Sequence, residues 1–202
     1  MQWILPGTVL RANAEDADHV ESLFQPMFLA GGMVLSQVSS ITGLEPYIIQ
    51  NWVKRGFLTP PQCKRYTLRQ LCRILNINML KGVLPMERIC GMLAYINGQL
   101  DDDSDDTIDD SQFYFMFVRL AAQAKEMDRS GAWMAAIAPV RQDYQVAGPG
   151  AWMAAIDQVL QDYQEAVPGA RERIAQVLRI MLIAYVAARM KEEAEGLLTE
   201  LT

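Results

Sequence analysis

Apolar residues recur at helical spacing along most of the chain, and this pattern predicts a mainly all-α protein. A first helix is expected near residues 16–29, where Pro26 would bend or end it. A second helix is expected to begin at a Ser36 cap and to run to about Thr42. Gly43 then supplies a turn.

Three further elements follow this turn. Residues 45–55 are predicted to form a helix, and residues 57–66 a short hairpin that prolines stiffen. Thr67 is expected to cap the next helix, and another helix should lie between Pro85 and Gly98.

Residues 111–202 are predicted to form a C-terminal helical bundle with an internal repeat. Residues 131–149 and 150–168 match at 14 of 19 positions, and Pro139 should kink the first copy. Each copy places a tryptophan, an isoleucine, a valine and a tyrosine on one helical face, for which core packing is a commoner explanation than a ligand pocket. These residues are Trp133, Ile137, Val140 and Tyr144, and then Trp152, Ile156, Val159 and Tyr163.

The last helix is expected near residues 170–198, with an apolar middle and an acidic end. Its most apolar stretch, residues 174–188, is interrupted by Arg179 and is shorter than the roughly 20 residues that a bilayer span needs. The pattern therefore favours a buried core helix and no membrane partner.

The composition divides the chain into four expected parts: an N-terminal helical extension (1–32), a basic segment (33–98), an acidic linker (99–110) and the helical domain (111–202). Seven of the ten residues from 101 to 110 are aspartate, which is typical of a solvated linker. The run could instead compete with DNA for the basic segment. A calcium loop is disfavoured because the EF-hand spacing, with its glycine and closing glutamate, is missing.

Charge is segregated along the chain. Residues 33–98 carry eight lysines and arginines against two glutamates, a net charge of +6, although the whole chain has −6. The remainder must therefore carry −12. Because a polyanion responds to the local field, the basic segment can still bind nucleic acid.

The basic segment also has the residues that a helix-turn-helix needs. Ser39 is small enough for the two helices to touch, while Leu44, Ile49 and Trp52 would face inward. The side chains left outside suit base and phosphate contacts, as do the basic residues of the hairpin. The predicted DNA-binding set is Tyr47, Gln50, Asn51, Lys54, Arg55, Lys64, Arg65 and Tyr66.

Residues 34–97 resemble the winged helix-turn-helix of MerR-type regulators, through Gly56-Phe57-Leu58-Thr59-Pro60 and Arg65-Tyr66. The chain through about residue 127 is similar to an uncharacterised bacterial domain-of-unknown-function family with this MerR-like half. The resemblance implies a winged helix-turn-helix with a short β-hairpin wing.

Three departures separate the chain from MerR-type regulators. Gln50-Asn51-Trp52 stands where they carry a phosphate-gripping Arg-x-Tyr, and the wing is shorter. No long heptad helix is predicted to follow, so their mode of dimerisation is not implied.

The leading hypothesis is a cytoplasmic DNA-binding transcription regulator whose partner is double-stranded DNA. A homodimer through the C-terminal helices is a further expectation. The alternative is a protein-interaction adaptor that keeps the winged-helix shape without binding DNA. With one histidine and three scattered cysteines, no catalytic residue, metal site or cofactor is predicted.

Overall fold

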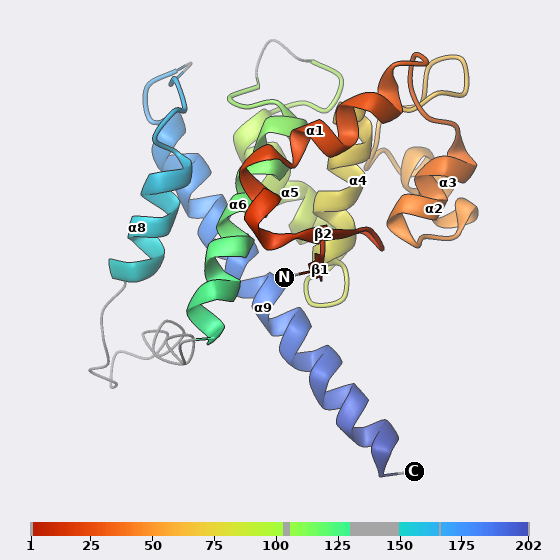
Figure 1. The fold of residues 1–202 in the computed structure, drawn as a ribbon. Coiled ribbons are helices and arrows are strands. Elements are labelled where there is room, and N and C mark those ends of the chain that lie inside the picture. Colours follow the sequence, from red (N-terminus) through yellow and green to blue (C-terminus); the bar gives the residue numbers. More distant parts are fainter. Residues whose placement is uncertain (1, 103–105, 130–149, 166, 202) are drawn as a thin grey trace.

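A computed structural model describes residues 2–102, 106–129, 150–165 and 167–201 (Figure 1). This part of the chain is mainly helical, with one small two-stranded antiparallel sheet. The strands are β1 (Gln2–Ile4) and β2 (Arg11–Asn13). The helices are η1 (Ala14–His19), α1 (Glu21–Phe24), η2 (Gln25–Phe28), α2 (Leu35–Thr42), α3 (Pro46–Lys54), α4 (Leu68–Leu80), α5 (Met86–Asn97), α6 (Asp110–Arg129), α8 (Gly150–Val159) and α9 (Ala170–Glu200).

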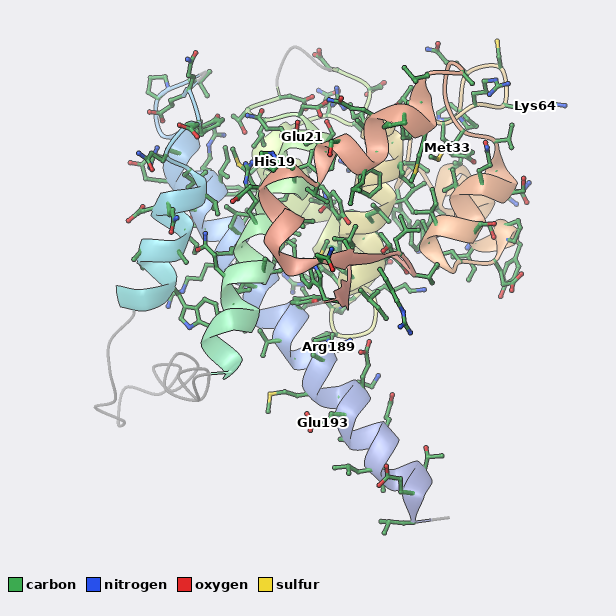
Figure 2. All side chains as sticks on the ribbon, in the orientation of Figure 1. His19, Glu21, Met33, Lys64, Arg189 and Glu193 are labelled. Carbon is green, nitrogen blue, oxygen red and sulfur yellow. The ribbon has the colours of Figure 1, made fainter. Side chains whose placement is uncertain are left out.

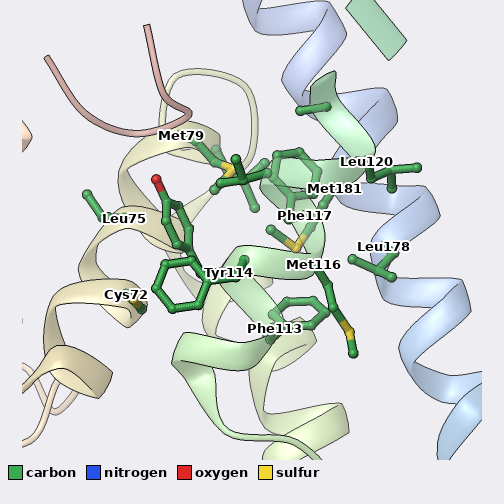
Figure 3. Packing of buried hydrophobic residues seen from close by; sticks show 14 of the residues in the cluster. Cys72, Leu75, Met79, Phe113, Tyr114, Met116, Phe117, Leu120, Leu178 and Met181 are labelled. Carbon is green, nitrogen blue, oxygen red and sulfur yellow. The ribbon is translucent and has the colours of Figure 1, made fainter. Parts of the chain in front are cut away.

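Helix α4 is the centre of the fold. Ten of its 13 residues are buried, so other elements must cover it on nearly every side. Helices α2, α5, α6 and α9 all pack against it. Figure 3 shows the central packing, in which α4 contributes Cys72, Leu75 and Met79, α6 contributes Phe113, Tyr114 and Phe117, and α9 contributes Leu178 and Met181.

The N-terminal segment belongs to this core. The Tyr114 hydroxyl on α6 donates to the carbonyl of Pro6 at 2.9 Å. The Asn78 amide on α4 donates to the carbonyls of both Gly7 and Thr42, at 2.8 and 2.9 Å. The turn between β1 and β2 is thereby attached to the end of α2.

The single helix predicted over residues 16–29 does not form. The chain makes three short helical segments there, η1, α1 and η2. Pro26 lies in the first turn of η2, so the prediction that it would bend or end a helix is confirmed.

Most predicted helix ends lie within a residue or two of the observed ones. Ser36 is not the cap of α2, because the helix begins at Leu35 and the Gln37 side chain accepts from the Val34 N–H at 2.9 Å. The Thr67 cap of α4 is confirmed, since its hydroxyl accepts from the Gln70 N–H at 3.2 Å.

The acidic stretch is not a solvated linker throughout. Ile108 and Asp110 are only 3% and 2% exposed. The Thr107 hydroxyl donates to the carbonyl of Ile96, and the Tyr163 hydroxyl donates to the Thr107 carbonyl at 2.6 Å. Residues 106–110 therefore join α5, α6 and the segment after α8, and one core runs across the predicted domain boundaries.

In the second repeat copy, the predicted apolar face packs inward. Ile156, Val159 and Tyr163 are buried, and Trp152 packs against the core from a partly buried position. The core-packing interpretation is confirmed for this copy. The first copy, residues 131–149 with Pro139, lies outside the described residues. Among the helices that the structure describes, none is long and apolar enough to cross a membrane.

Candidate nucleic-acid interface

Helix α3 has one buried and one exposed face. Ile49 and Trp52 are 0% and 3% exposed, and they hold the helix against the core together with the buried Leu44. Ser39 connects the two helices, because its hydroxyl donates to the Leu44 carbonyl at 2.6 Å and its carbonyl accepts from the Gly43 N–H. This arrangement orients α3 as the sequence pattern predicted.

The opposite face of α3 carries four of the predicted contact residues. Tyr47, Gln50, Asn51 and Lys54 follow the helical spacing i, i+3, i+4 and i+7, and all four are exposed. A stripe with this spacing lies along one side of the helix. It presents an aromatic hydroxyl, two amides and an ammonium to a partner.

Arg55 is held beside this stripe by two contacts. Its guanidinium is paired with Glu87 on α5 at 3.1 Å, with both side chains well exposed. It also lies over the Phe57 ring, 4.5 Å from the centroid. Because an exposed ion pair of this kind contributes little, Arg55 can exchange Glu87 for a phosphate.

Lys64 projects from a tight turn in the loop that follows α3 (Figure 2). The Arg65 N–H donates to the Gln62 carbonyl at 2.8 Å, and the two central residues, Cys63 and Lys64, have φ of 48° and 62°. Two successive residues with positive φ make a turn of the kind that closes β-hairpins, here without a glycine.

The predicted hairpin wing is reduced to this turn. Residues 57–66 contain the single bridge Gln62–Arg65, and Tyr66 pairs outside the loop with Met33, before α2. The regular sheet of the described residues is instead the β1–β2 hairpin.

Tyr66 does not suit the DNA contact predicted for it. Its side chain is 3% exposed, and burial raises the pKa of its phenol. It anchors the loop to the core instead. Arg65 is exposed, but its guanidinium donates to the Gly32 carbonyl at 2.8 Å, so it also helps to fix the loop.

Gln70 on α4 holds the other end of the loop. Its amide nitrogen lies within hydrogen-bond distance of the Thr59 carbonyl, the Thr59 hydroxyl and the Pro60 carbonyl, at 3.0 to 3.2 Å. This role of Gln70 was not predicted from the sequence. Its place three residues after the Thr67 cap was the available signal, because a capping box orients the side chain at that position.

A largely apolar groove of about 770 Å³ separates α3 from the loop. Four of the eight predicted residues border it, namely Gln50, Lys54, Lys64 and Tyr66. The other four, Tyr47, Asn51, Arg55 and Arg65, lie outside its lining. The complete lining is Val34, Leu35, Ser36, Gln50, Val53, Lys54, Pro61, Lys64 and Tyr66. The fold thus brings the cations of α3 and of the loop to the two sides of one groove.

Two cations of the basic segment are already paired inside the protein. Arg69 pairs with Asp106 and lies 3.8 Å from both Asp109 and Asp110. Arg73 pairs with Asp110 at 3.4 Å, where both side chains are buried. Burial raises the pKa of Asp110, and Arg73 and then Arg69 oppose that rise.

The basic segment therefore has fewer cations available to a polyanion than the sequence count of eight indicates. Aspartates of the acidic stretch pair with Arg69 and Arg73 of the basic segment. Competition with DNA, the alternative interpretation of this stretch, stays a prediction. The contacted arginines lie on α4, however, and not on α3 or the loop. Among the residues that the structure describes, no cluster of three or more metal-ligating side chains occurs.

Part of the chain is similar to a family of known sequences. Residues 29–117 match the model of a family described as Domain of unknown function (DUF1836). The chain is also 31% identical over 84 residues to "Uncharacterized protein YkrK" of Bacillus subtilis (strain 168). That alignment covers 40% of this chain and 36% of the relative, so the chain matches about a third of the relative's length. No solved structure matches the chain.

These matches support the expected uncharacterised domain-of-unknown-function family. The matched region begins before α2 and ends within α6, so it includes the acidic stretch that the sequence analysis took for a linker. The packing of residues 106–110 against α4 agrees with one continuous unit across this region.

Proposed function

We propose that the protein is a transcription regulator that binds double-stranded DNA through α3 and the turn at residues 62–65. The observation that carries the proposal is the exposed polar stripe of α3, which lies across a groove from the cationic turn. An α-helix is about 10–12 Å across with its side chains, so α3 can enter a major groove about 12 Å wide.

Each part of this surface has a role in the proposal. Gln50 and Asn51 lie in the middle of the stripe, where their amides can read adenine edges. Lys54 and Lys64, on the two sides of the groove, contact phosphates of the DNA backbone. Arg55 contacts a further phosphate when its ion pair with Glu87 is broken. Arg69 and Arg73 take no part, because carboxylates already hold them.

The proposal predicts a steep dependence of binding on salt. If Lys54, Arg55 and Lys64 each contact one phosphate, the slope of log K against log salt is about −2.7. Fluorescence anisotropy with a labelled duplex between 50 and 200 mM salt measures this slope. In the same assay, Lys54→Ala with Lys64→Ala should reduce the slope by about 2 units.

Two results would contradict DNA binding. One is the absence of any duplex binding near 50 mM salt. The other is a slope that the double variant leaves unchanged. Lys191→Ala on α9 is the matched control for Lys64→Ala alone, since each removes one positive charge from an exposed site, and it should leave the slope unchanged.

A protein-interaction adaptor remains the second candidate, and the groove favours it. Val34 is 38% exposed there, and Leu35, Val53 and Pro61 extend the apolar wall. Selection of genomic DNA fragments by the purified protein separates the two candidates. An enriched sequence motif supports the regulator, and failure to enrich any motif supports the adaptor.

A further inference from the structure

Helix α9 carries an apolar seam on the side that faces away from the core. Its residues alternate in steps of three and four, which is the spacing of a coiled coil: Ile180, Ile183, Ala187, Met190, Ala194 and Leu197. All six are exposed, and the large ones are 47% to 58% exposed. Single exposed apolar residues are ordinary, but a continuous seam of this length is typical of an interface.

The end of the helix extends beyond the rest of the molecule. From Arg189 to Glu200 every residue is exposed, and Figure 1 shows this end of α9 projecting away from the other helices. Arg189 and Glu193 mark the projecting part in Figure 2. The seam therefore begins beside the core and continues along a part of α9 that is open on all sides.

The order of residues in α9 did not predict a heptad helix, because the seam is only one of two apolar faces. Up to Val186, its other face is also apolar, with Ile174, Leu178 and Met181 buried in the core. The two apolar faces together hide the alternation of three and four. The burial of each side chain in the structure is what distinguishes the exposed seam from the buried face that contains Ile174, Leu178 and Met181.

We propose that this seam binds the α9 seam of a second copy of the chain, with the two helices antiparallel. The charges of α9 favour this direction. Its first 22 residues contain five basic residues and one glutamate, and its last nine contain four glutamates and no basic residue. A parallel pair would bring the two acidic ends together. In an antiparallel pair with the register given below, the acidic end of each helix lies beside residues 177–185 of the other, which contain Arg179 and no acidic residue.

The seam also defines the register of the pair. When the two helices are offset so that seam positions form layers, Ile180 faces Leu197 of the second copy, Ile183 faces Ala194, and Ala187 faces Met190. In the two inner layers a large side chain meets an alanine, so the layers fill without clashes. Arg179 then flanks the outer layer beside Glu200 of the second copy, and symmetry repeats this ion pair.

The first test measures the mass of the full-length protein in solution, without DNA, by size-exclusion chromatography with light scattering. The wild-type chain is expected to be a dimer. Leu197→Glu should weaken the dimer by about tenfold or more, because it buries an unpaired charge in an outer layer. Thr199→Glu is the matched control, since it adds the same charge two residues away and off the seam, and it should leave the dimer intact.

Circular dichroism is the check that each variant is folded. The substituted residues are exposed in the single chain, so the core should not be disturbed. A monomeric wild-type chain at micromolar concentration overturns the proposal. A dimer that withstands Leu197→Glu also overturns it. Neither result bears on DNA binding by α3, which the salt dependence tests separately.

The second test examines the antiparallel register by exchanging charges. Arg179→Glu and Glu200→Arg should each weaken the dimer, and the double variant should restore it. Within one helix these residues are 21 positions and about 31 Å apart, so restoration requires a second chain. A double variant no stronger than the single variants overturns the antiparallel register.

Discussion

Lys64 and Asn51 differ in what they can contribute to DNA binding. Lys64 projects from a turn and carries a point charge, which suits any phosphate. Asn51 is exposed in the middle of the α3 stripe and carries an amide, which can distinguish one base from another. Their distinct chemistry makes their roles separable.

Lys64→Ala is expected to weaken binding to all duplex sequences by a similar factor, and Asn51→Ala to change the sequence preference. Competition binding against a panel of duplexes measures both effects. Equal losses on every duplex from both variants would contradict the assigned roles.

Gly7 is fixed by backbone geometry. Its φ is +72°, and a Cβ built there would lie 2.4 Å from the carbonyl oxygen of Leu75 on α4. Both the left-handed backbone and the close approach of α4 therefore require glycine.

Gly7→Ala should lower the free energy of unfolding by about 1–3 kcal/mol or more, because backbone strain of this kind usually costs that much. Urea unfolding followed by circular dichroism measures the change. Gly82→Ala is the control, because a Cβ there meets nothing within 4 Å and its φ is not positive. Equal stability of the two variants would show that the N-terminal turn is not attached to α4 as described.

Helices α4 and α6 are joined by the buried pair of Arg73 and Asp110. Because burial raises the pKa of Asp110 above its ordinary value of 3.8, the folded protein binds this proton more tightly than the unfolded chain does. The contribution of Asp110 to stability is therefore most favourable below pH 3.8 and decreases as the pH rises through the folded pKa.

Asp110→Asn cannot titrate, so it removes this pH dependence. As the pH is raised above 3.8, the free energy of unfolding of the wild type should fall relative to that of the variant. Denaturant titrations at a series of pH values measure the difference. Asp101→Asn, at an exposed position, should leave the wild-type profile unchanged, and a similar effect of both variants would contradict the assignment to Asp110.

The hydrophobic core connects all the parts into which the composition divided the chain. Trp3 and Phe24 from the N-terminal segment, Leu71 from α4 and Leu178 from α9 belong to the same buried cluster. A core of this kind favours a single cooperative unfolding transition.

A fragment of residues 1–98 is therefore expected not to fold by itself. It lacks α6 and α9, so the apolar side of α4 that carries Cys72 and Leu75 would be exposed to water. Thermal unfolding followed by circular dichroism should show a cooperative transition for the full chain and none for the fragment. A cooperative transition in the fragment would show that residues 1–98 fold without α6 and α9.

Local features were predictable from the order of residues. The helices α3, α4 and α5, the turn at Gly43, the inward Ile49 and Trp52 and the exposed stripe of α3 all follow from periodicity and capping, which act within about one helical turn. For the same reason the sequence analysis identified the face of α3 on which the functional proposal rests.

Contacts between distant segments decided the features that the sequence did not predict. Arg69 and Arg73 pair with aspartates 37 residues away or more, Tyr66 enters the core by pairing with Met33, and one face of α9 is exposed because no other described element covers it. Local periodicity carries no information about such pairings. The spacing of charged or apolar residues along a helix is the same whether or not a distant segment packs against them. The folded arrangement therefore determines which cations remain available for DNA and which apolar seam remains available for a second copy.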